Sequence, residues 1–256
     1  MLIGALPLLG RLTLYLLAGV AAGVANGIAG GGTFITFPTL LSQGIVALQA
    51  NISTTVGVVP SYIGSIRLFR HQIRPHRQLL RTLVPSCVLG AVTGCALLLN
   101  GSASTFRSLV PWLIGVGTLL FALTPLITRA LTRVEHTHPA RRGALYVGIF
   151  AVSVYGGYFG AGMGILLLAV MGLALPLEIH ALHGLRNALS MIINVSAAIV
   201  FIIHGHLALQ AVSMLLVGTL IGGWLGALLI MRLSPTLVRV LVILIGAATT
   251  VKLALG

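Results

Sequence analysis

The chain has 256 residues, of which 58% are hydrophobic and only 7% are charged. Soluble domains carry about 25% charged residues, so the composition excludes an ordinary soluble protein and predicts an all-α polytopic membrane protein. Fifteen Lys and Arg residues against two acidic residues give a formal net charge of +13.

Most of the basic residues flank apolar segments, which is typical of positive-inside topology signals rather than of a nucleic-acid-binding surface. We therefore expect the lipid bilayer, and no nucleic acid, as a partner. The apolar runs are continuous rather than alternating, which excludes a transmembrane β-barrel. Two acidic residues are too few for a carboxylate cage around a divalent cation, and the His-x-His pairs lack Cys or carboxylate support, so no metal site is predicted.

The first apolar segment, about Leu12 to Ala29, ends in a cluster of glycines. Each glycine inside a helix costs about 1 kcal/mol relative to alanine, so Asn26–Gly32 predicts a break in the helix. The following stretch, Thr33–Leu41, is too short to span a bilayer and predicts a half-helix or re-entrant segment. Small residues that allow close helix packing precede the break at every fourth position: Gly19, Gly23 and Gly27.

Three further spans are predicted before the middle of the chain. The first is Ala47–Phe69, with a kink at Pro60. A dense basic loop follows, which the positive-inside rule assigns to the cytoplasm; its basic residues are Arg67, Arg70, His71, Arg74, His76, Arg77 and Arg81. Leu83–Leu99, which carries Gly90 and Gly94 as a packing face, and Val110–Leu131 are the other two spans.

A hydrophilic segment, residues 132–142, divides the chain near its midpoint and predicts a cytoplasmic linker. A second glycine cluster, Gly156–Gly164, follows it. Four more spans are predicted: Ala144–Ala161, Leu185–Ile203, Leu209–Met231 and Leu237–Leu255. The predicted architecture is thus about eight transmembrane helices with two short re-entrant or broken half-helices.

The two halves, residues 1–131 and 143–256, are related in sequence. The two glycine clusters align at an offset of 130 residues, and Asn51 aligns with Asn187 at 136. Four full spans per half would make the repeats parallel. If each glycine break adds a crossing, the repeats become inverted, and the positive-inside rule favours this second arrangement.

Polar residues follow each glycine break inside apolar sequence. Asn51 and Thr54 lie on the helix after the first break, and Asn187 and Asn194 lie on the matching helix. Amides and hydroxyls in a bilayer need partners, so these residues either form hydrogen bonds between helices or line a polar cavity.

Arg186 is the most informative charged residue. It is predicted to begin the second polar helix, where its repeat partner is Ala50. Its guanidinium suits a sulfonate, sulfite or carboxylate; alternatively, it extends from a helix end to the lipid headgroups. Glu178 and His183 lie just before it and form either a proton relay or part of a plain loop.

Catalytic and nucleotide-binding functions have no support. Neither glycine cluster is followed by Gly-Lys-Ser/Thr, so no nucleotide is expected. The chain has no H-E-x-x-H motif and no evident nucleophile–base pair. We expect neither an enzyme nor a cofactor.

Several motifs resemble the TauE/SafE sulfite exporter family. They are the Gly23-x-x-Asn26-Gly27-x-x-Gly30-Gly31-Gly32 run, Pro38, Asn51-x-Ser53-Thr54, the Tyr155–Leu167 block and Gly222-Gly223-Trp224-Leu225-Gly226-Ala227. The resemblance covers essentially the whole chain. It implies a permease of the bacterial inner membrane that moves sulfite or related organosulfur anions, usually by export and without an ATPase of its own.

The leading hypothesis is a secondary transporter, an exporter of sulfite or an organosulfonate. A passive anion channel and a non-transporting membrane subunit are the alternatives, and a homo-oligomer is compatible with each. The predicted substrate-binding residues are Asn26, Gly30, Gly31, Gly32, Asn51, Thr54, Gly160, Gly162, Arg186, Asn187 and Asn194, with Glu178 and His183 as the candidate proton relay.

Overall fold

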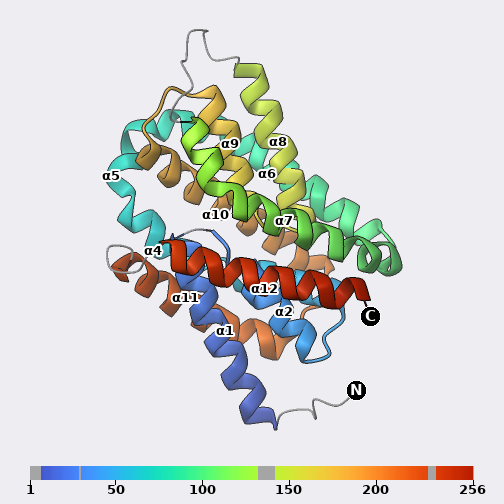
Figure 1. Ribbon diagram of the computed structural model, residues 1–256. Coiled ribbons are helices and arrows are strands. Elements are labelled where there is room, and N and C mark those ends of the chain that lie inside the picture. Colours follow the sequence, from blue (N-terminus) through green and yellow to red (C-terminus); the bar gives the residue numbers. More distant parts are fainter. Residues whose placement is uncertain (1–6, 29, 132–141, 230–234, 256) are drawn as a thin grey trace.

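A computed structural model describes residues 7–28, 30–131, 142–229 and 235–255. Within these ranges all regular secondary structure is helical (Figure 1). The elements are α1 (Leu8–Ile28), α2 (Thr33–Ser42), α3 (Ala47–Gly57), α4 (Ser61–Leu68), α5 (Arg70–Ile73), η1 (Arg74–His76), α6 (Arg77–Asn100), α7 (Ala103–Leu131), α8 (Arg142–Tyr158), α9 (Met163–Ala174), α10 (Ile179–His204), α11 (Leu209–Leu229) and α12 (Pro235–Leu255).

The all-helical membrane class is confirmed. In the described ranges, 6 helical segments are long and apolar enough to cross a membrane, and α2, α8 and α9 are shorter apolar helices. The predicted span Ala47–Phe69 is divided into α3 and α4. The division falls at Val58–Pro60, because proline offers no backbone N–H to continue the helical ladder.

Several predicted boundaries were wrong. The basic stretch predicted as a loop is largely helical, since α5, η1 and the first turns of α6 run through it. Arg and Gln are good helix formers, and α6 therefore begins at Arg77 instead of Leu83. Most of the predicted linker lies outside the described residues; Arg142 begins α8.

Both glycine clusters break a helix with the same backbone geometry. Gly30 has φ 83° and Gly160 has φ 80°, in the left-handed region that glycine adopts without strain. In each break the amide of this glycine donates to the carbonyl five residues earlier, Ala25 or Tyr155, at 2.9 and 3.1 Å. This pattern is typical of a glycine that terminates a helix. Each break is followed by a short helix, as predicted.

Backbone-to-backbone contacts join α1 to α11 and α6 to α8. A methyl group added at Gly23 would lie 2.6 Å from the Gly223 amide nitrogen, and one at Gly19 would lie 3.0 Å from the Cα of Gly218. Gly90 lies against the carbonyl of Phe150 in the same manner. The predicted small-residue packing faces are therefore confirmed. In both pairs the contact positions advance together, so the two helices run in the same direction.

Other helix pairs run in opposite directions. In α7 and α12, Gly115 lies against Thr250 and Thr118 against Gly246. In α4 and α10, the Asn194 side chain contacts Tyr62, whereas Gly184, earlier on α10, packs on Phe69 after the end of α4. Figure 1 shows α7 and α12 side by side across the front of the bundle.

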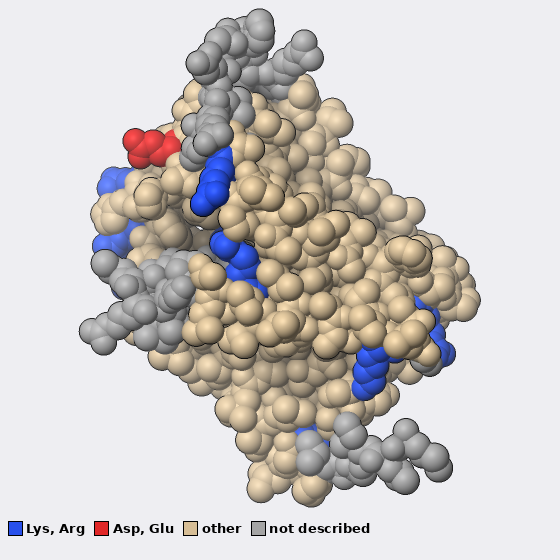
Figure 2. All heavy atoms as spheres, viewed as in Figure 1, with Lys and Arg blue, Asp and Glu red and all other residues tan. Residues whose placement is uncertain are grey.

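The bundle has two distinct ends. We call the end formed by α5, η1 and the starts of α6 and α10 the basic end; it lies at the left of Figure 1. The opposite end is formed by the α2–α3 connection, the α6–α7 turn and the ends of α10 and α12. Figure 2 shows basic side chains in small groups on a surface that is otherwise almost uncharged.

Candidate functional site

Arg186 lies inside the bundle. It is the eighth residue of α10, which begins at Ile179, so the prediction that Arg186 begins this helix was wrong. Only 3% of the residue is exposed, which argues against a side chain that extends to the headgroups from a helix end. The prediction placed the helix start too late because Glu178, His180 and His183 interrupt the apolar sequence around the first turns of α10.

The Arg186 side chain contacts both glycine regions. A methyl group on Gly30 would lie 3.8 Å from its guanidinium carbon, and one on Gly164 would lie 3.4 Å from its Cδ. Gly164 is in the first turn of α9, directly after the second break. The N-terminus of a helix carries positive potential, so α9 adds to the positive charge of the guanidinium at this point.

The positive charge of Arg186 has no carboxylate partner within the described part of the chain. Its Nε and Nη2 both donate to Asn187 Oδ1, at 3.2 and 2.8 Å. Glu178 is the one acidic residue in the described ranges, and it is exposed just before α10 begins. A buried charge without a counter-ion costs several kcal/mol in a protein interior. The interior around Arg186 is therefore suited to an anion.

Asn187 has a free donor. Its Oδ1 accepts from Arg186, but its Nδ2 is buried without a hydrogen-bond partner among the described residues. The residue is only 1% exposed. An unsatisfied buried amide costs about 1 to 3 kcal/mol, so this nitrogen is a second group that a buried ligand would satisfy.

Ser190 and Asn194 of α10 form a hydrogen-bond network with Tyr62 of α4. Asn194 Nδ2 donates to the Ser190 carbonyl at 2.9 Å and to the Tyr62 hydroxyl oxygen at 3.3 Å. Tyr62 is also within electrostatic range of Arg186. Asn194, one of the polar residues predicted on this helix, thus packs against α4.

Asn26 braces the first break. Its Oδ1 accepts from the Gly32 amide at 2.7 Å, and its Nδ2 donates to Ser61 Oγ at 3.0 Å. Gly31 lies against α7 and α12, where a methyl group would come within 2.9 Å of the Phe121 ring. The Gly30 amide donates to the Ala25 carbonyl. Of the three predicted site glycines of the first break, Gly30 and Gly32 therefore already use their amides in hydrogen bonds within the protein.

The second break has its own set of contacts. Asn51 Nδ2 donates to the Tyr158 carbonyl at the end of α8, at 2.9 Å. Gly162, with φ 79°, caps α9 and lies near Gly117. Thr54 Oγ1 is buried and without a partner in the described ranges. The predicted site residues therefore divide into one group around Arg186 and the first break, and another around the second break.

The predicted proton-relay residues lie at the start of α10. Glu178 is exposed at its N-cap position, and His183 is half-buried in the second turn. The alternative prediction of a plain loop was wrong for His183, which is helical. His183 is within electrostatic range of Arg186, and no hydrogen bond links it to Glu178.

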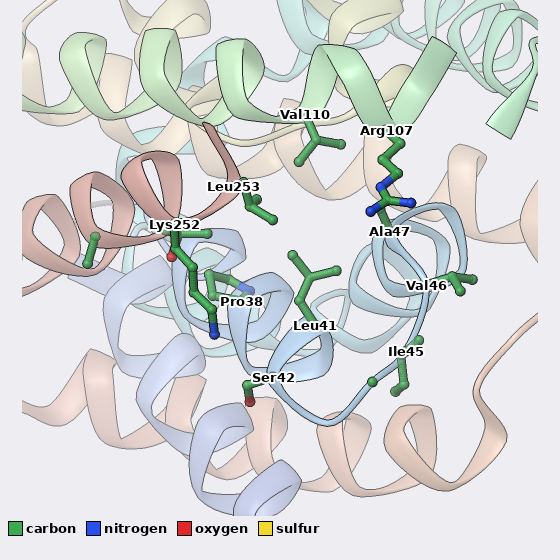
Figure 3. A pocket seen from close by; sticks show the side chains of 13 residues that line it. Pro38, Leu41, Ser42, Ile45, Val46, Ala47, Arg107, Val110, Lys252 and Leu253 are labelled. Atoms are coloured by element: carbon green, nitrogen blue, oxygen red, sulfur yellow. The ribbon is translucent and has the colours of Figure 1, made fainter. Parts of the chain in front are cut away.

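A pocket of about 560 Å³ lies at the opposite end, between the α2–α3 connection, α7 and α12. Figure 3 shows Arg107 and Lys252 on either side of it, with Leu41 and Val110 between them. Both basic residues are exposed. An anion that reaches this end would meet positive charge there.

Buried aromatic rings of α2, α7 and the second break pack together between the pocket and the first break. Phe34 contacts Phe121 with ring centroids 5.8 Å apart, and Phe37 contacts Phe159 at 5.5 Å. Phe106 packs on Phe159 at 6.3 Å. The next turn of α2, with Pro38 and Leu41, lines the pocket.

Comparison with known proteins decides the family. The sulfite exporter TauE/SafE family matches residues 15–253 of this chain. The chain belongs to this family. It is 26% identical over 245 residues to a Haemophilus influenzae protein named probable membrane transporter protein, and the alignment covers 92% of this chain and 91% of that protein.

A second TauE/SafE relative is the probable membrane transporter protein YfcA of Escherichia coli K12. The identity is 26% over 243 residues, covering 91% of this chain and 85% of YfcA. With the 6 candidate spans, these relationships identify a multi-pass bacterial membrane transporter of the TauE/SafE type. The family resemblance drawn from the glycine motifs is confirmed.

The sequence prediction of the site omits two residues that the structure places beside Arg186. Gly164 belongs to the second glycine block and was treated only as part of the motif. Tyr62 lies on α4, after the helix division at Pro60, and contacts Asn194 of α10. A tyrosine two residues after the predicted proline kink is the signal that could have identified it.

Proposed function

We propose that this protein is a secondary transporter for a small anion, with sulfite or an organosulfonate as the substrate class, and that Arg186 binds the anion inside the membrane. The observation that carries the proposal is a buried arginine without a carboxylate partner in the described chain. Ionisable residues inside membranes are costly and usually functional. The family name supports a sulfur oxyanion and the direction of export.

The helix directions support two inverted repeats. The glycine clusters align α1 with α8. An offset of 132 residues aligns Gly90 with Gly222 and Arg107 with Arg239, so α6 corresponds to α11 and α7 to α12. α6 runs from the basic end to the opposite end. α11 runs the other way: it begins after Ala208, whose amide donates to Ser53, and its last turns carry Trp224, which lies under Arg67 at the basic end. Because α1 is parallel to α11 and α8 to α6, corresponding helices run in opposite directions. Inverted repeats with broken helices near the centre are typical of secondary transporters.

Positive-inside topology places the basic end in the cytoplasm. Arg186 would then receive the anion from the cytoplasmic side, and the pocket with Arg107 and Lys252 would face outwards. The buried aromatic rings of α2 follow the first break and precede the turn of α2 that lines the pocket, so they would close a path between the two. Movement of α2 and α9 about the glycine breaks would open one side at a time, which is the alternating access that a carrier requires.

The proposal is tested by anion flux in proteoliposomes. Arg186→Gln removes the charge with little change in volume, and we expect it to abolish flux of sulfite or an alkylsulfonate. Arg186→Lys keeps the charge but loses the planar fork, so flux should be reduced but measurable. Arg81→Gln, at an exposed arginine of the basic end, is the matched control. Flux at the wild-type rate in Arg186→Gln, with intact expression, would remove Arg186 from the site.

A passive channel would use the same residues, and an energetic measurement separates the two functions. A carrier coupled to protons accumulates substrate against its own gradient when a proton gradient is imposed, whereas a channel only equilibrates it. The burial of Arg186 favours the carrier, because a conducting channel needs a continuous open path. Absence of flux for every anion would support a non-transporting subunit.

A further inference from the structure

The two repeat-equivalent asparagines are used differently. Asn51 donates its amide group to the Tyr158 carbonyl and so holds the end of α8. Asn187 instead offers its carbonyl oxygen to two guanidinium nitrogens of Arg186, and its amide group is left without a partner. An asparagine has one acceptor end and one donor end, and the arginine fixes which end of Asn187 faces the site.

The groups that Arg186 and Asn187 leave free for a ligand are donors: the outward side of the guanidinium and Asn187 Nδ2. Nε and Nη2 are held by Asn187, while Nη1 faces Gly30. The Tyr62 hydroxyl is already engaged, because its oxygen accepts from Asn194 and its other side-chain partner is Ser190. Asn187 Oδ1 is occupied by Arg186. His183, half-buried one turn earlier on α10, is the other titratable neighbour of Arg186.

We propose that Arg186 and Asn187 form a donor-only clamp that selects oxyanions without an O–H group, such as sulfonates and the sulfite dianion. Oxyanions that keep a proton, such as hydrogen phosphate and bicarbonate, are discriminated against. This inference rests on the proposed function. It adds that the same site distinguishes oxyanions by whether they carry an O–H group. The physical cause is that an O–H facing N–H donors leaves both sides unsatisfied in a buried site.

A matched ligand pair isolates this property. Methanesulfonate and methylphosphonate have the same shape, and at mildly acidic pH both carry a single negative charge. They differ in one O–H, which only the phosphonate keeps. One buried donor mismatch typically changes affinity by about 10- to 100-fold, so we expect the wild-type protein to bind methanesulfonate at least about tenfold more tightly.

Removing the Asn187 amide should reduce this ratio. In Asn187→Leu the sulfonate loses the hydrogen bond from Nδ2, and the phosphonate loses the unfavourable contact between its O–H and Nδ2. The guanidinium loses its Oδ1 acceptor in both complexes alike. The ratio of the two dissociation constants should therefore fall towards one. The smaller substitution Asn187→Ala is measured in parallel, so that the ratio can still be measured in one variant if the other does not fold.

The control is the equivalent residue of the other repeat. Asn51→Leu and Asn51→Ala remove an amide that is already bonded to Tyr158, and the ligand ratio should stay at its wild-type value even if the proteins melt earlier. Binding is measured by calorimetry in detergent at mildly acidic pH, together with flux in the Arg186→Gln variant.

The outcomes separate the inference from the proposed function. Equal affinity of the wild-type protein for the two ligands, or an unchanged ratio in both Asn187 variants, overturns the donor-only clamp. If Arg186→Gln has nonetheless lost flux, the anion site stands. Wild-type flux in Arg186→Gln overturns the proposed site itself, and failure of the wild-type protein to bind methanesulfonate overturns both.

Discussion

A single methyl group at Gly23 tests whether α1 and α11 are held together by contact between their backbones. In Gly23→Ala the new carbon would lie 2.6 Å from the Gly223 nitrogen and 2.6 Å from the Thr219 carbonyl oxygen. Both atoms belong to the backbone, so no side chain can move aside. The two helices would have to separate locally, which also loosens the glycines one turn away on either side.

The expected loss of stability follows from these distances. Overpacking of a tight interface costs about 1 to 3 kcal/mol, and the better helix propensity of alanine returns up to about 1 kcal/mol. A net loss of about 1 to 2 kcal/mol corresponds to a lowering of the melting temperature by about 2 to 8 °C in a protein of this size. The measurement is a thermal melt in detergent, followed by tryptophan fluorescence. The two tryptophans are Trp224, which follows Gly223 on α11 and lies under Arg67, and Trp112 on α7.

Gly143→Ala is the matched control. Gly143 is in the first turn of α8, and a methyl group there meets no atom within 4 Å. This substitution should leave the melting temperature unchanged or raise it slightly. An unchanged or higher melting temperature in Gly23→Ala would refute the close packing of α1 on α11.

The remaining predictions concern the first break. Asn26→Ala removes the two hydrogen bonds to Gly32 and Ser61, and we expect a loss of about 1 to 3 kcal/mol in a thermal melt, whereas Asn100→Ala, at the exposed end of α6, should have no measurable effect. Gly31→Leu drives a side chain into the Phe121 ring and should abolish flux in proteoliposomes. Transport at the wild-type rate would show that the close contact of Gly31 with α7 and α12 is not required for transport.

The sequence was sufficient to identify the two helix breaks and the charged residue Arg186, because both are local properties. Glycine clusters oppose helix formation wherever they stand, and an arginine within a mostly apolar segment is unusual in any membrane protein. The offset between Gly30 and Gly160 also predicted a common geometry, and the two residues have nearly the same φ. The start of α10 was missed because Glu178 and His183 are polar, although polar residues commonly occupy the first turns of a helix.

The partners of the polar residues could not be predicted from the sequence. Asn51 and Asn187 align in the sequence, but Asn51 donates to the Tyr158 carbonyl and Asn187 accepts from its own neighbour Arg186. That difference depends on tertiary contacts that no local pattern contains. Similarly, the contact between Tyr62 and Asn194 appears only when α4 packs on α10.

The most direct test of the central claim is an experimental structure with a bound alkylsulfonate. Our account predicts the ligand between the two glycine breaks, with its oxygens within hydrogen-bond distance of Arg186 and of Asn187 Nδ2, the donor that is unsatisfied in the present structure. A ligand bound elsewhere, for example only between Arg107 and Lys252, with Arg186 still bonded to Asn187 alone, would contradict it.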